Sequence, residues 1–301
     1  MIRRFVARHS RLFHVTDRIA AVVFTISATA LAVYLVVGRW GVDETYLATR
    51  WPLYLEAAQV SLYYTSFAFA VGLVIGLFFG WTRAITTQPL RKILRDARRA
   101  HGPRFPVGPF IAYGTKYYLR RVGDGFVATI RGTPLFVQIM FAAAVLRIRF
   151  PQIDPLLIGV IAGLVALTLN TAGYQSEIFR AGFQTVHSGQ VEAARAIGLS
   201  RSGAMRYVVL PQALRLVIPP LTNEYIGLLK VSSLLLVVGI LELTGFGRRE
   251  AFISAAVFES FALVTGIYLL LTVPISKVVS WIERKYRVPG LGIQAEATIR
   301  A

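Results

Sequence analysis

Polar side chains inside apolar runs are the residues of this chain that could act on a solute. Asn170, Tyr174 and Glu177 are spaced four and three residues apart, so a helix would carry them on one face. They lie in or just after an apolar run, 156–174, and polar groups at membrane depth normally face protein or a water-filled cavity. The pattern indicates a path for a polar solute. For Asn170, hydrogen bonding between helices without a ligand is an equal alternative.

A second polar group lies in another apolar run, 222–241. Lys230 could meet a substrate carboxylate or Glu224, or extend its ammonium to the inner membrane surface. Together the two groups give the substrate-path candidates Asn170, Tyr174, Glu177, Thr222, Asn223, Glu224 and Lys230.

Several other kinds of chemistry are excluded. The 301-residue chain has no cysteine, and its four histidines are scattered through polar segments, so we expect no metal site. We find no GxxxxGK[ST] loop for ATP, no Ser/His/Asp constellation and no paired carboxylates. We therefore expect no catalytic residue and no cofactor in this chain.

The elements that must position the polar groups are membrane spans. The sequence is 55% hydrophobic with a mean hydropathy of +0.58. We expect an all-α integral membrane protein with about six transmembrane helices, because apolar runs of spanning length recur. A cleaved signal peptide is less consistent with the first run, which is too long for one. The expected spans are 19–37, 60–81, 126–146, 156–174, 222–241 and 261–281.

The charges between these spans give an orientation. The expected external loops, which include 38–58 and 242–259, hold six of the 33 Lys/Arg and seven of the 15 Asp/Glu. The other 27 basic and 8 acidic residues lie on or near the inner side, as the positive-inside rule predicts for cytoplasmic termini. The net charge of +18 therefore does not call for nucleic acid. A basic segment, 82–125, contains an amphipathic pattern at 90–97 that we expect on the anionic inner leaflet.

Two local patterns inside the spans concern helix geometry. Gly72, Gly76 and Gly80 recur every fourth residue and allow close helix packing, including packing within the subunit. The motif Arg131-Gly132-Thr133-Pro134 predicts a broken helix, since Pro134 has no backbone donor. Alternatively, a helix simply begins at Pro134 with Thr133 as its cap.

The polar stretch 192–211 predicts a helix, a turn at Gly198 and a second helix. Gly198 can take the left-handed conformation that ends a helix. Ser200 or Ser202 could cap the second helix, which Pro211 would stop, and Pro219-Pro220 would mark a further break. A solvated loop between spans is the simpler interpretation, and a docking element for a soluble partner is the alternative that the spacing favours.

That spacing resembles the EAA loop of type I ABC importer permeases, which in that family is a coupling helix. The matched residues, which would couple to the ATPase, are Glu192, Ala193, Ala194, Gly198, Leu210 and Pro211, with Val208 between them. The RGTP motif and the run from Asn170 to Phe179 resemble the polar amino-acid branch, whose members serve histidine, glutamate, glutamine, arginine or opine-like substrates. A departure occurs at 229–234, where Val231 and Ser232 replace the family's acid and threonine.

The resemblance implies the following assembly. Residues 59–286 would form the permease core, after an N-terminal region, 1–58, with an extra span, and before a cytoplasmic tail, 287–301. The partners would be a cytoplasmic ABC ATPase that binds ATP and Mg, an extracytoplasmic substrate-binding protein and a second permease, identical or homologous. The chain would be multi-pass in the bacterial inner membrane, and its lipid bilayer would be a further partner. The amino acid, the type of dimer and the roles of the extra span and of 82–125 stay open.

Three other functions remain as alternatives. A permease for another small solute would share the coupling loop. An ion-coupled secondary transporter would need acids at mid-membrane depth, and the acids lie near the expected span ends. An integral scaffold without a transport path would not need the broken third span or the polar fourth one.

Overall fold

The computed structural model describes residues 41–84, 107–185 and 188–286, with isolated positions at 23, 24, 27, 31, 92 and 95. In these ranges every regular element is helical. Four helices are long and apolar enough to cross a membrane, or five if the bent pair α4–α5 counts as one span. The fold is therefore the expected all-α bundle. Apart from isolated positions, the expected span 19–37, the amphipathic pattern 90–97 and the tail 287–301 lie outside the described residues.

Helix α6 (Pro155–Thr185) is the centre of the bundle. Its apolar window is 61% buried, against 22–28% for the other three spanning helices. Helix α2 (Glu44–Ala84) lies along it and presents its glycine face. A Cβ at Gly76 would stand 2.7 Å from Gln175 Cβ on α6, and Gly72 and Gly80 are equally tight. The glycine stripe thus packs two helices of one subunit together.

The N-terminal half of α2 corrects the expected external loop, 38–58. The helix begins at Glu44, and the Asp43 carboxylate accepts from the Tyr46 backbone N–H at 2.8 Å. Tyr46 and Tyr54 are buried, with their hydroxyl oxygens 2.8 Å apart. Their burial against α10 and α11 explains the error, because aromatic residues suited to a membrane interface are here part of a core.

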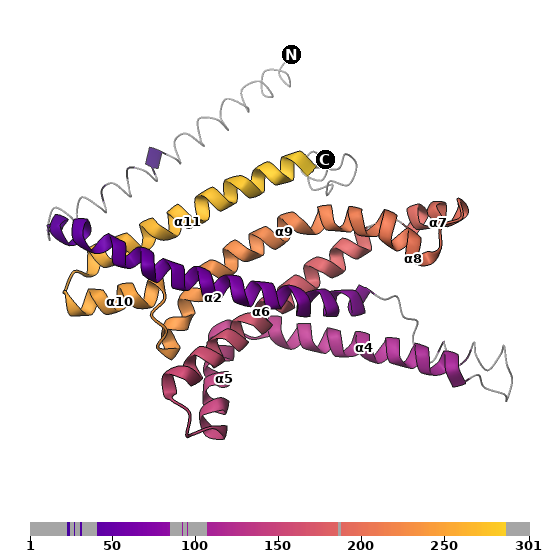
Figure 1. Cartoon of the computed structure of the whole chain (residues 1–301), viewed down its shortest axis with the longest axis horizontal. Coiled ribbons are helices and arrows are strands. Elements are labelled where there is room, and N and C mark those ends of the chain that lie inside the picture. The colour runs from indigo at the N-terminus through magenta and orange to yellow at the C-terminus, as the bar shows by residue number, and fades with distance from the viewer. Residues whose placement is uncertain are drawn as a thin grey trace, which may run out of the picture.

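The third span is a bent pair. Helix α4 (Val107–Gly132) and helix α5 (Leu135–Arg149) meet at 104°. In Figure 1, α5 points away from the rest of the bundle. Thr133 does not cap α5, because its hydroxyl donates to Thr129 O at 3.0 Å. The break is thus the correct interpretation, and residues 107–125, expected in the basic insertion, form the first part of α4.

The fifth span starts earlier than expected. Helices α7 (Ser188–Ala196) and α8 (Arg201–Ala204) lead into a π-helical turn, Met205–Val209, and then α9 (Leu210–Val231). The apolar helical stretch runs over Ser202–Val238 and ends in a 3-10 helix, Ser232–Val238. Pro211 therefore does not stop the helix, and the Pro219-Pro220 break is also wrong. The wider π turn separates the Pro211 ring from the carbonyl four residues before it, where an α turn would bring a clash.

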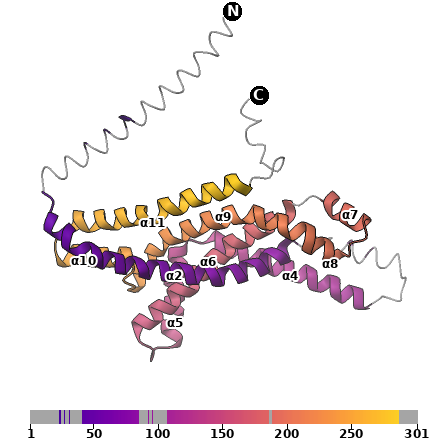
Figure 2. The same ribbon diagram turned by 45° about the horizontal axis from the view of Figure 1, so that its top comes forward.

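Helix α10 (Leu243–Ile253) replaces most of the expected last loop, 242–259. The Glu242 side chain caps it by accepting from the Thr244 and Gly245 backbone N–H groups at 3.0 and 2.7 Å. Buried Leu243 packs with Tyr54 of α2 and Val264 of α11 (Val257–Tyr286). Figures 1 and 2 place α10 and the α7–α8 segment at opposite ends of the bundle.

Candidate functional site

A cavity of about 490 Å³ opens where the α4–α5 break faces α6 and α9. Asn170 lies at the middle of α6, and Glu224 lies near the middle of the Ser202–Val238 stretch. The cavity is therefore at mid-depth of both helices. It is lined by Arg131, Gly132, Thr133, Pro134, Leu135, Asn170, Tyr174, Glu224, Gly227, Leu228 and Val231.

The wall at the break is held by Gln138, which follows the broken-helix motif and was not among the expected site residues. Its amide nitrogen lies 2.7 Å from Ile130 O, 2.8 Å from Thr133 Oγ1 and 3.1 Å from Thr133 O. Its amide oxygen accepts from Asn170 Nδ2 at 3.3 Å. A glutamine four residues after a proline, on the next helical turn, was the available signal.

The cavity has two polar poles. The Arg131 guanidinium lies over the Tyr174 ring at 5.1 Å and supplies donors. Glu224 and Asn170 supply acceptors: Thr171 Oγ1 donates to Glu224 Oε1 at 3.1 Å, and the Asn170 amide oxygen bonds no described residue. A solute with separate anionic and cationic groups would match such a cavity.

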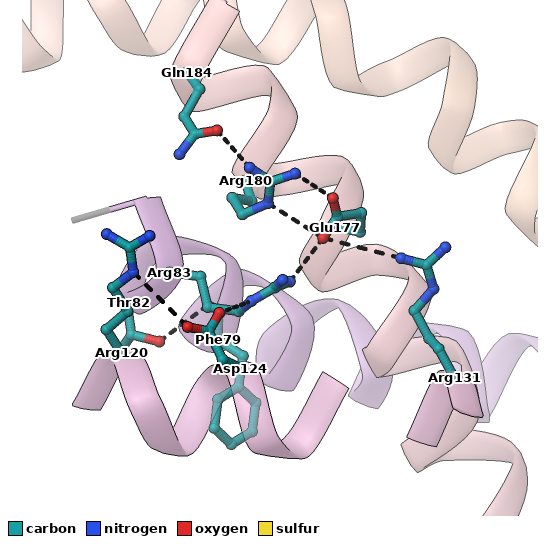
Figure 3. A network of polar contacts seen from close by, with 9 residues as sticks. All are labelled: Phe79, Thr82, Arg83, Arg120, Asp124, Arg131, Glu177, Arg180 and Gln184. Carbon is teal, nitrogen blue, oxygen red and sulfur yellow. Dashed lines mark hydrogen bonds and ion pairs between the residues drawn. The ribbon is translucent and has the colours of Figure 1, made fainter. Parts of the chain in front are cut away.

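Glu177 lies outside the cavity, in a network that joins three helices (Figure 3). Arg83 Nη1 of α2 lies 2.8 Å from Glu177 Oε2, and Arg83 Nε lies 2.9 Å from Asp124 Oδ1 of α4. Arg180 also pairs with Glu177, while Arg131 Nη1 stands 4.0 Å from it. Because Arg83 and Arg180 already neutralise Glu177, Arg131 keeps donors for the cavity.

The other candidates are placed elsewhere. Thr222 donates its hydroxyl to Ile218 O in its own helix, and Asn223 and Lys230 are exposed and do not line the cavity. The structure thus brings together Asn170, Tyr174 and Glu224 out of the seven, along with the four residues of the broken-helix motif. The expectation that acids lie near span ends is wrong for Glu224, since α9 begins twelve residues before Thr222.

The loop 192–211 has a defined turn. Gly198 has φ +93°, its N–H bonds Arg195 O at 3.0 Å, and the Leu199 N–H bonds Ala194 O at 3.1 Å. This pair of bonds is the Schellman ending of a helix. The Ser200 hydroxyl then accepts from the Gly203 N–H at 3.0 Å, as expected of a cap.

The residues expected to couple to an ATPase differ in exposure. Glu192, Ala193, Leu210 and Pro211 are exposed, and Gly198 has open space around it. Ala194 is 5% exposed, so it does not face outward within this chain.

Comparison with known proteins agrees with the fold. Residues 105–288 match the family described as binding-protein-dependent transport system inner membrane component. The glutamine transport system permease protein of Escherichia coli is 33% identical over 239 residues, which cover 79% of this chain and 94% of that protein. A probable glutamine ABC transporter permease protein of Bacillus subtilis is 40% identical over 56% of this chain and 76% of its own length.

A solved structure extends the comparison. A chain of the crystal structure of an amino acid ABC transporter with histidines superposes with a TM-score of 0.65 at 30% identity, over 81% of this chain and 99% of that one. The fold and the cavity define a membrane transport subunit. The chain belongs to the family of binding-protein-dependent transport system inner membrane components, that is, to the permeases of ABC transporters.

Proposed function

We propose that this chain is the permease subunit of an ATP-driven importer for polar amino acids and forms the translocation path across the bacterial inner membrane. The observation that carries the proposal is the mid-depth cavity with Arg131 as donor pole and Glu224 and Asn170 as acceptor pole. A free α-amino acid carries a carboxylate and an ammonium, which are complementary to these poles. The glutamine permeases among its relatives support the same substrate class.

In this proposal, the energy for transport comes from a partner protein. A cytoplasmic ABC ATPase with ATP and Mg would receive the loop 192–211, with exposed Glu192 at its surface. A soluble binding protein would deliver the amino acid at the opposite end, near α10. A second permease, identical or homologous, would complete the path, and both termini would lie in the cytoplasm.

The first test is a pull-down of the tagged chain, crosslinked in the membrane before detergent extraction and assayed for a bound ATPase and for ATP hydrolysis. Glu192→Lys is expected to lose both while the chain stays in the membrane. Glu56→Lys, the same change at an exposed position of α2, is the control and is expected to keep both. No hydrolysis in any sample, or equal hydrolysis in Glu192→Lys and wild type, would contradict the docking role.

One observation also favours a second function. Glu224 is an acid at mid-depth, which an ion-coupled carrier would need. Uptake of radiolabelled glutamine, glutamate, histidine and arginine into cells separates the two. An importer driven by ATP stops when ATP is depleted and continues when the proton gradient is collapsed at constant ATP, whereas an ion-coupled carrier shows the opposite response.

A further inference from the structure

Gln138 is the side chain that connects the helix break to the cavity. We propose that Gln138 is a positioning residue for transport, whose amide nitrogen replaces the backbone donor that Pro134 lacks and whose amide oxygen orients Asn170. The inference rests on the proposed function, since it assigns Gln138 to the passage of a solute through the cavity.

The donor half of this role follows from helix geometry. In a continuous α-helix the carbonyl of Ile130 would accept from the backbone N–H four residues later. That residue is Pro134, which has none. Gln138 Nε2 fills the position at 2.7 Å, and it also reaches Thr133 Oγ1 at 2.8 Å. Because the Thr133 hydroxyl donates to Thr129 O, its oxygen is free to accept. Gln138 therefore ties the last turn of α4 to the first turn of α5.

The acceptor half concerns the polarity of the cavity. Gln138 Oε1 holds Asn170 by its amide nitrogen at 3.3 Å. An asparagine held in this way turns its amide oxygen to the other side, and Asn170 lines the cavity. The oxygen bonds no described residue and is thus an acceptor for a solute ammonium. Gln138 consequently sets both the shape of the wall 132–135 and the polarity of Asn170.

Substitutions at position 138 distinguish a hydrogen-bonding role from a residue that only fills space at the break. Gln138→Met keeps the length of the side chain and removes both halves of the amide. Gln138→Glu keeps an acceptor for Asn170 but places a carboxylate against the oxygens of Ile130 and Thr133. Pure packing predicts little effect from either change, whereas the proposed role predicts loss from both.

The experiment measures uptake of labelled glutamine, glutamate, histidine and arginine by the complete complex in proteoliposomes. Gln138→Met and Gln138→Glu are expected to lower uptake by about tenfold, as when a partly buried polar group loses its hydrogen-bond partner. Gln152→Met, the same change on an exposed loop, is expected to have no effect. Uptake at the wild-type rate in either Gln138 variant would overturn the proposal.

Pro134→Ala provides the decisive rescue, because alanine restores a backbone N–H for the Ile130 carbonyl. In this background Gln138→Met is expected to lower uptake by less than about threefold, since the Ile130 carbonyl keeps a donor and only the bonds to Thr133 and Asn170 are lost. Loss by the same factor in both backgrounds would overturn the donor role. If Gln138→Met does not accumulate in the membrane, the double variant is expected to restore its level, and failure to do so would also count against the inference.

Failure of the proposed function would give a different result in the same uptake assay. Wild-type complex that imports none of the four amino acids would contradict the substrate class. The role of Gln138 at the break is then decided by the melting temperatures of four proteins: wild type, Gln138→Met, Pro134→Ala and the double variant. The stability lost in Gln138→Met is expected to be smaller in the Pro134→Ala background, and equal losses would overturn it.

Discussion

Arg83 Nη1 lies 2.8 Å from Glu177 Oε2, so a cation in the last turn of α2 is paired with a carboxylate on α6, 94 residues later in the chain. The same guanidinium bonds Asp124 of α4 at 2.9 Å. One side chain thus joins α2, α4 and α6, and α4 is the helix that ends at the break (Figure 3).

Arg83→Met should destabilise the protein, because it leaves Asp124 with the more distant Arg120, at 3.8 Å, and removes one of the partners of Glu177. The Arg83 side chain is 13% exposed, so we expect a loss of about 1.5–3 kcal/mol, as for hydrogen bonds to charged groups. Arg50→Met is the matched control. Arg50 is 47% exposed and lies 3.7 Å from Glu250, and such surface pairs contribute about 1 kcal/mol or less. Thermal unfolding of the purified protein checks both, and equal losses would contradict the role assigned to Arg83.

The glycine face of α2 gives a second prediction. A Cβ at Gly76 would meet Gln175 Cβ at 2.7 Å and Ala172 O at 3.1 Å, so Gly76→Ala must push α2 and α6 apart. We expect it to cost about 1–3 kcal/mol, as for overpacking in a core. Gly266→Ala in α11 is the control, since nothing lies within 4 Å of its Cβ. The melting temperature should fall for Gly76→Ala and stay equal or rise for Gly266→Ala. The reverse order would refute this packing.

Much of the fold could be predicted from the sequence, and the errors have identifiable physical causes. Spanning length and apolar composition located the helices of the core, and the absence of a Cβ at Gly72 and Gly76 predicted their packing face. The starts of α2 and α10 were missed because Tyr46 and Glu242 look like residues for water or the membrane interface. In the fold, tertiary hydrogen bonds satisfy their polar atoms inside a core.

The candidate site was predicted only in part, again because partners that meet in the folded protein are not visible in the local sequence. Asn170, Tyr174 and Glu224 do line one cavity, but Glu177 is bound by Arg180 of its own helix and by Arg83 of α2, which is far from it in the sequence. Prolines were also treated as local breaks, whereas the π turn before Pro211 lets the helix continue. No pattern within a single segment contains a tertiary partner such as Arg83.

Glu242 gives a third prediction, on pH. Its carboxylate is completely buried and accepts from Ser61, Tyr268 and two backbone N–H groups, and burial raises its pKa above the usual value. A raised pKa means that the folded state binds the proton more tightly than the unfolded state. The stability gained is thus complete below pH about 4 and is lost as pH rises through the pKa of the folded protein.

Glu242→Gln should remove this dependence, because glutamine does not titrate. The melting temperatures of wild type and variant are compared between pH 4 and pH 8, and the difference between them should shift in favour of the variant as pH rises. Glu56→Gln, an exposed acid on α2, is the control and should leave the wild-type profile unchanged. A constant difference between wild type and Glu242→Gln across the range would contradict the assignment.

The turn at Gly198 gives the last prediction, which separates strain in the loop from contact with an ATPase. Its φ of +93° is unfavourable for residues with a Cβ, although asparagine tolerates the left-handed region better than alanine. Nothing lies within 4 Å of the Cβ position, so neither substitution clashes within this chain. If the turn itself positions the loop, Gly198→Asn should retain more ATP-dependent uptake than Gly198→Ala. Gly198→Asp, which adds a charge to the loop, should abolish uptake with the protein still in the membrane. Equal loss for asparagine and alanine would instead indicate that an ATPase leaves no room for any side chain there.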